Sequence, residues 1–396
     1  MAPTVAEGQI RVIPSVTVSE RYDTNVFFGF AAEGVNPKDY VSNVSPQVKV
    51  EHKGPLIDWD LTGGGTGEAY VNNPGLNYFG ANGALNLDLD RAVGQLVRGA
   101  GLKLSDAFLY TPQPPAFLAP GLTGPTSNPF VRGIQAFRVN SISNNGSVTG
   151  SYAFSTDLSF MATYAHSLLR FGKTFAPDTT TDTTTTTPGV GSVFDTTMQT
   201  ITAGPEARIS SLDMVGLTYQ HLHFEFGTGE TTSEFTTDGA MATWSRGLTP
   251  ELKAKVAGGV AVLKESNDLL YTAEASLAWT SPSTTMLLQF SRGIIPSFFL
   301  TPTPLLSQVL TASLSHKLTE DLSIIGNADY AYNESVTAQP AVFESYFATL
   351  GLSYTITRPL TATLSYTYSE FINSGAGGDF SFKRDVIMFS LRAEWK

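Results

Sequence analysis

The chain has 396 residues, no Cys, 24 Lys and Arg against 35 Asp and Glu, and a formal net charge of −11. Without Cys there is no disulfide, no thiolate metal site and no covalent haem attachment, and the negative charge argues against nucleic acid as a partner. Only 15% of the residues are charged, yet mean hydropathy is close to zero. No apolar run approaches the roughly 18 residues of a transmembrane helix, so a membrane role would fall to strands.

Two kinds of connection alternate along the chain and divide it into strands. Short turns, punctuated by Gly, Pro, Asp and Ser, are predicted at 52–56, 90–94, 154–157, 210–213, 247–251, 280–284, 317–321 and 357–359. Longer polar or Pro-rich segments lie between them, at 20–39, 70–77, 109–140, 172–196, 227–234, 265–268, 294–304, 335–341 and 372–380. Eight turns and nine loops predict about 18 strands, within a range of about 16 to 20. The even number places both ends of the chain on the short-turn side.

The predicted strands alternate between apolar and polar residues. In "RPLTATLSYTYSEF", residues 358–371, Leu360, Ala362, Leu364 and Tyr366 share one face, and Thr361, Thr363, Ser365 and Thr367 share the other. The alternation alone does not tell whether the apolar face meets a protein core or lipid. A soluble sandwich gives no reason for loop lengths to segregate by end, whereas an outer-membrane barrel has short periplasmic turns and longer extracellular loops.

The polar face of several strands carries charges and amides that a dry core would not accept without partners. On a barrel these residues would face water in the lumen, where charges of both signs indicate weak ion selectivity. The candidate pore-lining residues are Asp58, Asp60, Asn82, Asn86, Asp88, Lys103, Lys253, Lys255, Glu274, Asn327, Asp329, Arg384, Arg392 and Glu394.

Aromatic residues give a second indication of a membrane. All four tryptophans, Trp59, Trp244, Trp279 and Trp395, lie close to the short-turn ends of predicted strands. Because Trp prefers membrane interfaces, we expect them to form one aromatic girdle. Candidates for the opposite girdle are Tyr70, Tyr110, Tyr271, Tyr346, Tyr368 and Phe371.

These patterns predict an all-β chain folded as a single transmembrane, antiparallel, up-and-down β-barrel over residues 1–396. Residues 1–8, which lack the pattern of a signal peptide, are expected to be a short periplasmic segment of a mature protein. Residues 109–140 are loop 3, which is Pro-rich and either folds inward to narrow the pore or stays outside. Residues 172–196 are the Thr-rich loop 4, read as a mobile extracellular loop.

The segment "QHLHFEF" is the one candidate metal site. His221, His223 and Glu225 share one face of a strand and offer ring nitrogens and a carboxylate; the alternative is a solvated strand top beside a loop. The apolar residues Leu222, Phe224 and Phe226 take the other face, which suggests a bulge or the exit from the membrane.

No catalytic constellation is evident. Neither GxSxG nor HExxH occurs, and His166 and His316 lie in predicted strands without a neighbouring Ser and acid that the sequence identifies. We therefore expect no enzymatic activity and no cofactor.

Two segments resemble known outer-membrane proteins. The last strand, "VIMFSLRAEWK", resembles the terminal aromatic strand read by the bacterial barrel-assembly machinery, although Lys396 follows the aromatic residue. "SERYDTNVFF" and "KDYVSNVSPQVKVE" resemble the opening of β-barrel porins found with exopolysaccharide and protein-sorting loci. The matching positions are Tyr22, Asp23, Asn25, Val26, Phe27, Asp39, Ser45 and Pro46.

The resemblance implies an integral barrel of the bacterial outer membrane and transfers no catalytic residue. We expect a porin-like channel for passive passage of small solutes and ions, with outer-membrane lipid and the barrel-assembly machinery as partners. The alternatives are an exopolysaccharide export conduit with a periplasmic partner, a porin sheath around an electron-carrying cytochrome, and a surface adhesin with a plugged barrel.

Overall fold

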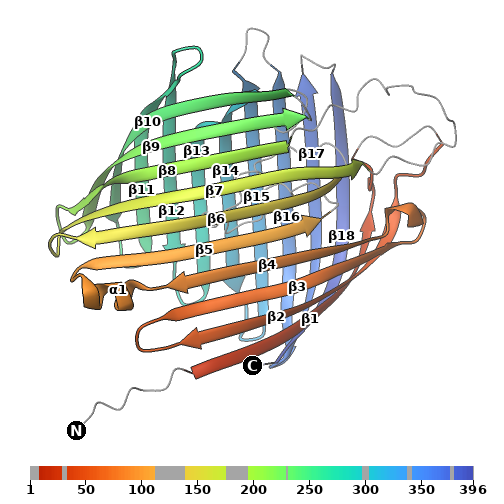
Figure 1. The fold of residues 1–396 in the computed structure, drawn as a ribbon. Coiled ribbons are helices and arrows are strands. Elements are labelled where there is room, and N and C mark those ends of the chain that lie inside the picture. Colours follow the sequence, from red (N-terminus) through yellow and green to blue (C-terminus); the bar gives the residue numbers. More distant parts are fainter. Residues whose placement is uncertain are drawn as a thin grey trace.

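The computed structural model describes residues 9–28, 34–111, 139–174, 195–228, 231–296, 303–336, 341–374 and 379–395. They form one 18-stranded sheet in which each strand pairs antiparallel with its neighbours in the chain. The sheet closes because β1 (Gln9–Asp23) pairs both with β2 (Asp39–Lys53) and with β18 (Phe380–Glu394). The result is the up-and-down barrel seen in Figure 1.

The strands between β2 and β18 run in order around the wall. They are β3 (Asp58–Tyr70), β4 (Tyr78–Asp88), β5 (Ala100–Thr111), β6 (Val139–Ala153), β7 (Leu158–Thr174), β8 (Asp195–Arg208), β9 (Asp213–Thr228), β10 (Thr231–Gly247), β11 (Leu252–Leu263), β12 (Asp268–Thr280), β13 (Thr284–Pro296), β14 (Pro304–Lys317), β15 (Leu322–Ser335), β16 (Val342–Thr357) and β17 (Leu360–Ser374).

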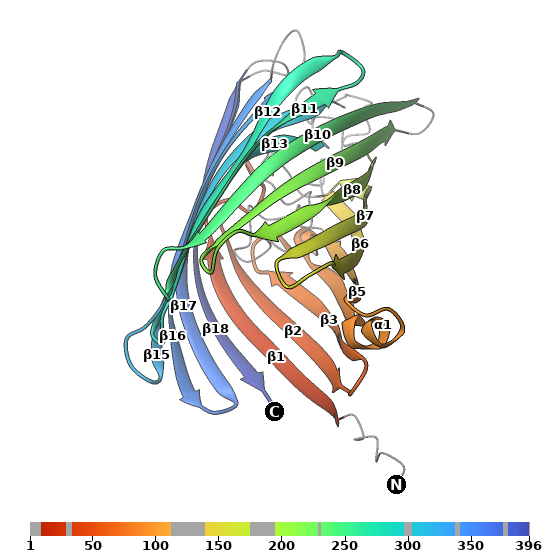
Figure 2. The same cartoon turned by 90° about the vertical axis from the view of Figure 1, so that its left-hand side faces the viewer.

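The connections fall where the sequence predicts them, with one difference in kind. We call the end of the barrel with the short connections the turn side and the opposite end the loop side; β1 begins and β18 ends at the turn side (Figures 1 and 2). The predicted tight turn at 90–94 is instead a short helix, α1 (Asp90–Leu96), between β4 and β5. On the loop side, a 3-10 turn, η1 (Pro74–Leu76), joins β3 to β4.

Hydroxyl side chains shape several of the short turns. Ser155, Thr249 and Thr319 each accept a hydrogen bond from the backbone N–H three residues later, which starts the next strand. In each of these turns the preceding residue also donates its backbone N–H to the same strand start. A Ser or Thr at the second turn position therefore sets a compact four-residue reversal.

Side chains that meet across non-neighbouring strands identify the inner face of the wall. Arg21 of β1 binds Glu68 of β3 across the intervening β2, which requires both to lie on the concave side of the closed sheet. Because side chains alternate along each strand, the register of the pairs then assigns the inner residues of every strand.

The outer wall is apolar over a broad band. Leu364 is 52% exposed although it is apolar, and the exposed large hydrophobics include Val256, Leu288, Leu350 and Ile387 on other strands around the barrel. A closed sheet forms all its backbone hydrogen bonds between its own strands, and this outer wall exposes apolar side chains to the surroundings. A membrane barrel requires both features. No helix among the described residues is long and apolar enough to span a membrane.

Candidate pore and its lining

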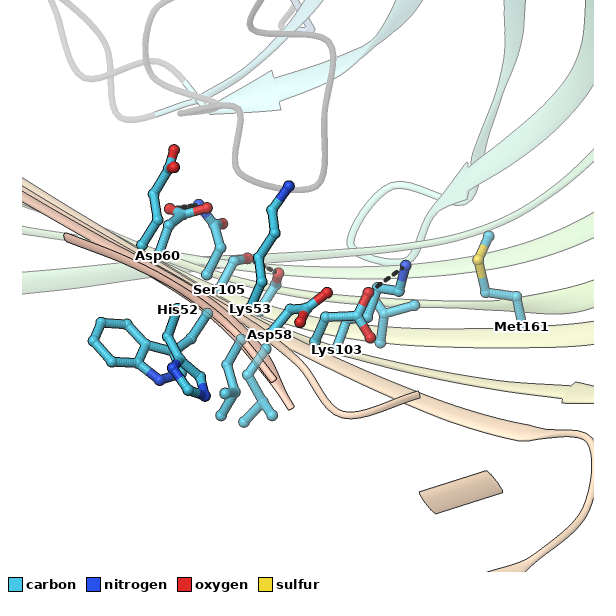
Figure 3. Close-up of a pocket in the computed structure, with 15 residues that line it drawn as sticks. His52, Lys53, Asp58, Asp60, Lys103, Ser105 and Met161 are labelled. Carbon is cyan, nitrogen blue, oxygen red and sulfur yellow. Dashed lines mark hydrogen bonds and ion pairs between the residues drawn. The ribbon is translucent and has the colours of Figure 1, made fainter. Parts of the chain in front are cut away.

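The inner wall is charged at the turn side. A cavity of about 580 Å³ lies against β2 to β7 there, lined by inward residues that include Lys53, Asp58, Asp60 and Lys103. Figure 3 shows these four side chains pointing to one side of the wall, while His52 points to the other. The turn-side part of the lumen is therefore both hollow and polar.

Ion pairs hold this charged surface together, and α1 contributes to them. The Lys103 ammonium lies 3.2 Å from both Asp88 and Asp90, and Arg91 of α1 pairs with Asp58. Asn86 donates a hydrogen bond of 2.9 Å to Asp60. All of these groups are partly exposed, so each pair adds little to stability. Their main effect is on the electrostatic field at the turn-side mouth of the lumen.

The other candidate lining residues also take inward positions by register. Lys255 and Glu274 form a 3.1 Å ion pair across β11 and β12, and Arg392 lies 2.8 Å from Glu394 on β18. The remaining inward candidates are Asn82, Lys253, Asn327, Asp329 and Arg384. Two of them do not meet open water: Asp329 is buried, and Arg384 belongs to a buried network.

That network contains the acidic residue of the N-terminal motif. The carboxylate of Asp23 is only 1% exposed and lies 2.6 Å from the Arg384 guanidinium. Arg21 binds Glu68 through two hydrogen bonds of 2.6 and 2.7 Å and reaches Tyr70 at 3.0 Å. Buried charges require such pairing. The network joins β1, β3 and β18 and therefore ties the barrel across its closure.

The rest of the motif packs the first connection against the inner wall. Asn25 donates its backbone N–H to Asp23 and its side-chain amide to the Lys383 carbonyl. Val26 and Phe27 are buried in a small apolar cluster with Val41, Tyr70 and Leu76, and the Phe28 ring lies 4.6 Å from the Arg384 guanidinium carbon.

Asp39, which follows the motif, is fully buried and fixes the neighbouring connection. It accepts hydrogen bonds of 2.8 Å from the Tyr40 and Asn72 backbone and from the Asn73 side chain. Five of the residues that carry the resemblance, Asp23, Asn25, Val26, Phe27 and Asp39, thus hold the loop-side connections near β1 to β4 in place.

A buried apolar layer lies inside the barrel near the loop side. Its members come from β7 to β9, from β13 and β14, and from β16 to β18, together with Phe28 after β1 and Ala341 before β16. They are Phe28, Leu169, Met198, Phe224, Phe226, Ile295, Leu305, Ala341, Phe343, Phe371 and Phe382. The inner wall therefore carries partly exposed charges at the turn side, whereas at the loop side the apolar layer and the Asp23–Arg384 network are both withdrawn from water.

The candidate metal residues lie on the outer face. His221 is 2.7 Å from Asp238, and His223 is 3.1 Å from Thr236 and 3.3 Å from Glu225. Within the described residues no group of three or more His, Cys, Asp or Glu could hold a metal ion.

In this segment the bulky apolar residues take the inward positions of the strand instead of the outward ones, and a bulge is not the cause. The pairing of β9 with β10 is continuous from Asp213 to Thr228, so the predicted bulge is wrong, and the exit from the membrane stays a prediction. Phe224 and Phe226 face inward because they belong to the apolar layer. A strand that enters this layer turns its bulky residues inside instead of outside.

Aromatic side chains mark both rims of the outer wall. The four tryptophans take outward positions near the turn side, where Trp244 donates to Asp213 at 3.1 Å and Trp59 stacks on His52 at 5.7 Å. Toward the loop side, outward tyrosines donate to carboxylates, as in Tyr346 to Glu344, Tyr366 to Asp385 and Tyr368 to Glu370.

Two of the expected loop-side girdle residues are not in it. Tyr70 and Phe371 face inward, into the ion-pair network and the apolar layer respectively. The predictions for loop 3 and loop 4 fall mainly on residues 112–138 and 175–194, which lie outside the described residues, as do residues 1–8.

An 18-stranded closed antiparallel barrel with an apolar outer wall, interfacial aromatics and a charged inner mouth is an integral outer-membrane β-barrel of the porin type. Residues 263–395 match the family model described as "Putative beta-barrel porin 2". A comparison with curated proteins finds no match.

The chain is similar to solved outer-membrane proteins at low sequence identity. Pseudomonas aeruginosa OccK2 (OpdF) is similar with a TM-score of 0.47 and 11% identity, over 97% of this chain and 98% of that one. The outer membrane protein opdK from the same organism gives 0.45 and 11%, over 97% and 99%. Its siderophore receptor PirA gives 0.45 and 7%, over 98% of this chain and 80% of that one.

Proposed function

We propose that the protein is a non-enzymatic outer-membrane channel for the passive passage of small solutes and ions. The observation that supports this most is the charged, hollow turn-side mouth with its cavity of about 580 Å³. A barrel wall that served only as a structural shell would have no need for charged groups on its inside. Outer-membrane lipid and the barrel-assembly machinery are the partners that this function requires.

The lining predicts the character of the channel. Acidic and basic groups alternate around the turn-side mouth and pair with one another, as Lys103 does with Asp88 and Lys255 with Glu274. Paired charges of both signs favour weak ion selectivity at this mouth. The apolar layer near the loop side then limits flow, because a hydrophobic constriction conducts only when it is wetted.

The decisive experiment is single-channel recording of the purified full-length protein in planar lipid bilayers. We expect discrete current steps with weak selectivity between potassium and chloride. A folded barrel that stays silent at all voltages would overturn the channel and leave the plugged adhesin. Folding is checked independently by the slower migration of the heated protein on gels, which membrane barrels show after unfolding.

The structure offers less support for export of a polysaccharide. Such a conduit needs aromatic faces open to the lumen, whereas the inward Phe224, Phe343 and Phe371 are all buried. The sheath around a cytochrome differs from the channel in one measurable respect, since it predicts stable copurification with a haem protein. We do not expect haem absorbance in the purified protein.

A further inference from the structure

Four polar side chains on the inner wall of β14 to β16 are buried without a hydrogen-bond partner for their oxygens. Asp329 is 7% exposed, Ser345 2%, and Asn333 and Ser307 are fully buried. The unpartnered atoms are both carboxylate oxygens of Asp329, the hydroxyls of Ser345 and Ser307, and the Asn333 side-chain carbonyl. Most buried polar groups in proteins are hydrogen-bonded, so four neighbouring exceptions call for a cause.

The strand register places these four residues in a row. Asp329 pairs with Thr311 of β14 and Phe347 of β16. One inward step farther toward the loop side, Ala331 pairs with Ser345, and at the next step Asn333 pairs with Ser307. Each step is about 7 Å along the strand. The row therefore runs from the middle of the barrel wall toward the loop side.

The row crosses the boundary between the two parts of the lumen. One inward step toward the turn side, Asn327 and Thr349 are partly exposed, as is Thr311 beside Asp329. On its loop side lie Leu305 and Phe343 of the apolar layer. Counted from the turn side, Asp329 is the first of the four, followed by Ser345 and then by Asn333 and Ser307.

The chemistry of the row specifies the kind of solute. The free atoms are acceptors, with Ser hydroxyls able to serve in that role, and the Thr311 hydroxyl faces the carboxylate without reaching hydrogen-bond geometry. Among the described residues no Lys, Arg or His lies within ion-pair distance of Asp329. Burial of an unpaired carboxylate is costly, and a cation with N–H donors would remove the cost.

A divalent metal prefers several oxygen ligands with more than one carboxylate among them. A single carboxylate therefore suits a monovalent cation better. Phe347 is in register with Asp329, and an aromatic ring at this position can attract organic cations. We propose that Asp329, Ser345, Asn333 and Ser307 form a track that binds the ammonium groups of organic solutes as they cross the apolar layer. This inference rests on the proposed channel function.

Reversal potentials of the full-length protein in planar bilayers test the track, with methylammonium chloride and tetramethylammonium chloride as probes. Methylammonium has three N–H donors and tetramethylammonium has none. We expect the wild type to favour methylammonium, and D329N to reduce this preference by about tenfold, because a charge-assisted hydrogen bond is lost. S345A should reduce it less. Glu334→Gln, on the outer face of the same strand, should leave it unchanged.

The outcomes separate the track from the channel. If D329N conducts current and prefers methylammonium over tetramethylammonium as strongly as the wild type does, the track is overturned and the channel function stands. A silent wild-type barrel would refute the channel, and the row is then tested by thermal unfolding. In that measurement methylammonium raises the Tm of the wild type more than that of D329N if the site exists, and equal shifts refute it.

Discussion

Asp23 illustrates at the level of one residue what a sequence motif does in this barrel. Its carboxylate is buried against Arg384 and accepts a hydrogen bond from the Asn25 backbone. The motif is visible in the sequence, but its partner lies at the other end of the chain. Pairing over that separation depends on closure of the barrel between β1 and β18, which no local pattern reveals.

Asp23→Asn should therefore destabilise the barrel. The change leaves the Arg384 charge buried without its carboxylate, which typically costs about 3–5 kcal/mol. Denaturant unfolding of the protein in lipid vesicles, followed by gel migration, measures the loss. Glu274→Gln is the matched control, because its ion pair with Lys255 is partly exposed and is worth less than about 1 kcal/mol. Equal losses would contradict the role given to burial.

Leu364 and its neighbours test which face of the wall meets lipid. Leu364 is outward, whereas Thr363 is inward by register. Arg at a lipid-facing position near mid-membrane costs about 2–4 kcal/mol. Leu364→Arg should thus reduce the folded fraction in vesicles far more than Thr363→Arg. Ser365 is a poorer control because it is 8% exposed, and Arg there would also clash. Similar yields of the two variants would refute the assignment of faces.

At the level of the element, two adjacent glycines of β11 have opposite surroundings. A Cβ on Gly259 would lie 2.2 Å from the Ala240 carbonyl oxygen of the neighbouring strand, whereas a Cβ on Gly258 would meet nothing within 4 Å. The backbone of β10 thus approaches β11 closely at Gly259. No side chain fits there unless the two strands move apart.

Gly259→Ala should consequently destabilise the barrel by about 1–3 kcal/mol, the usual cost of overpacking. Gly258→Ala should be neutral or slightly stabilising, because Ala restricts the unfolded chain more than Gly does. Denaturant midpoints of the two variants in vesicles provide the comparison. A tolerated Gly259→Ala would show that β10 and β11 can separate at this point without cost.

Elements were predictable where local chemistry decides them. The period-two alternation and the turn residues identify the strands, and the strand count of 18 is confirmed. The helix α1 escaped prediction because "DRAVGQL" is too short to show a helical period. Its residues Asp90 and Arg91 form ion pairs with Lys103 of β5 and Asp58 of β3. A local sequence pattern does not reveal such contacts.

At the scale of the whole molecule, the lumen has two parts that the sequence shows only in fragments. Partly exposed inward charges gather at the turn side, and buried inward apolar residues gather near the loop side. Each of the eight strands that contribute to the apolar layer supplies only one or two of its members. In the sequence these appear as isolated irregularities, such as Phe224 and Phe226 after two histidines. Their common height becomes evident only when the register of all the strands is known.

This layer should control the conductance of the barrel. Phe224→Ser places a hydroxyl in the buried layer and removes the ring, so water enters more readily and the open-channel current or open probability rises. Phe389→Ser, on the lipid-facing side of β18, should leave both unchanged. Phe to small substitutions in cores cost about 3–5 kcal/mol, so Met198→Thr provides a milder variant in the same layer. Single-channel records in which neither inner variant differs from the wild type would show that the flow is limited elsewhere.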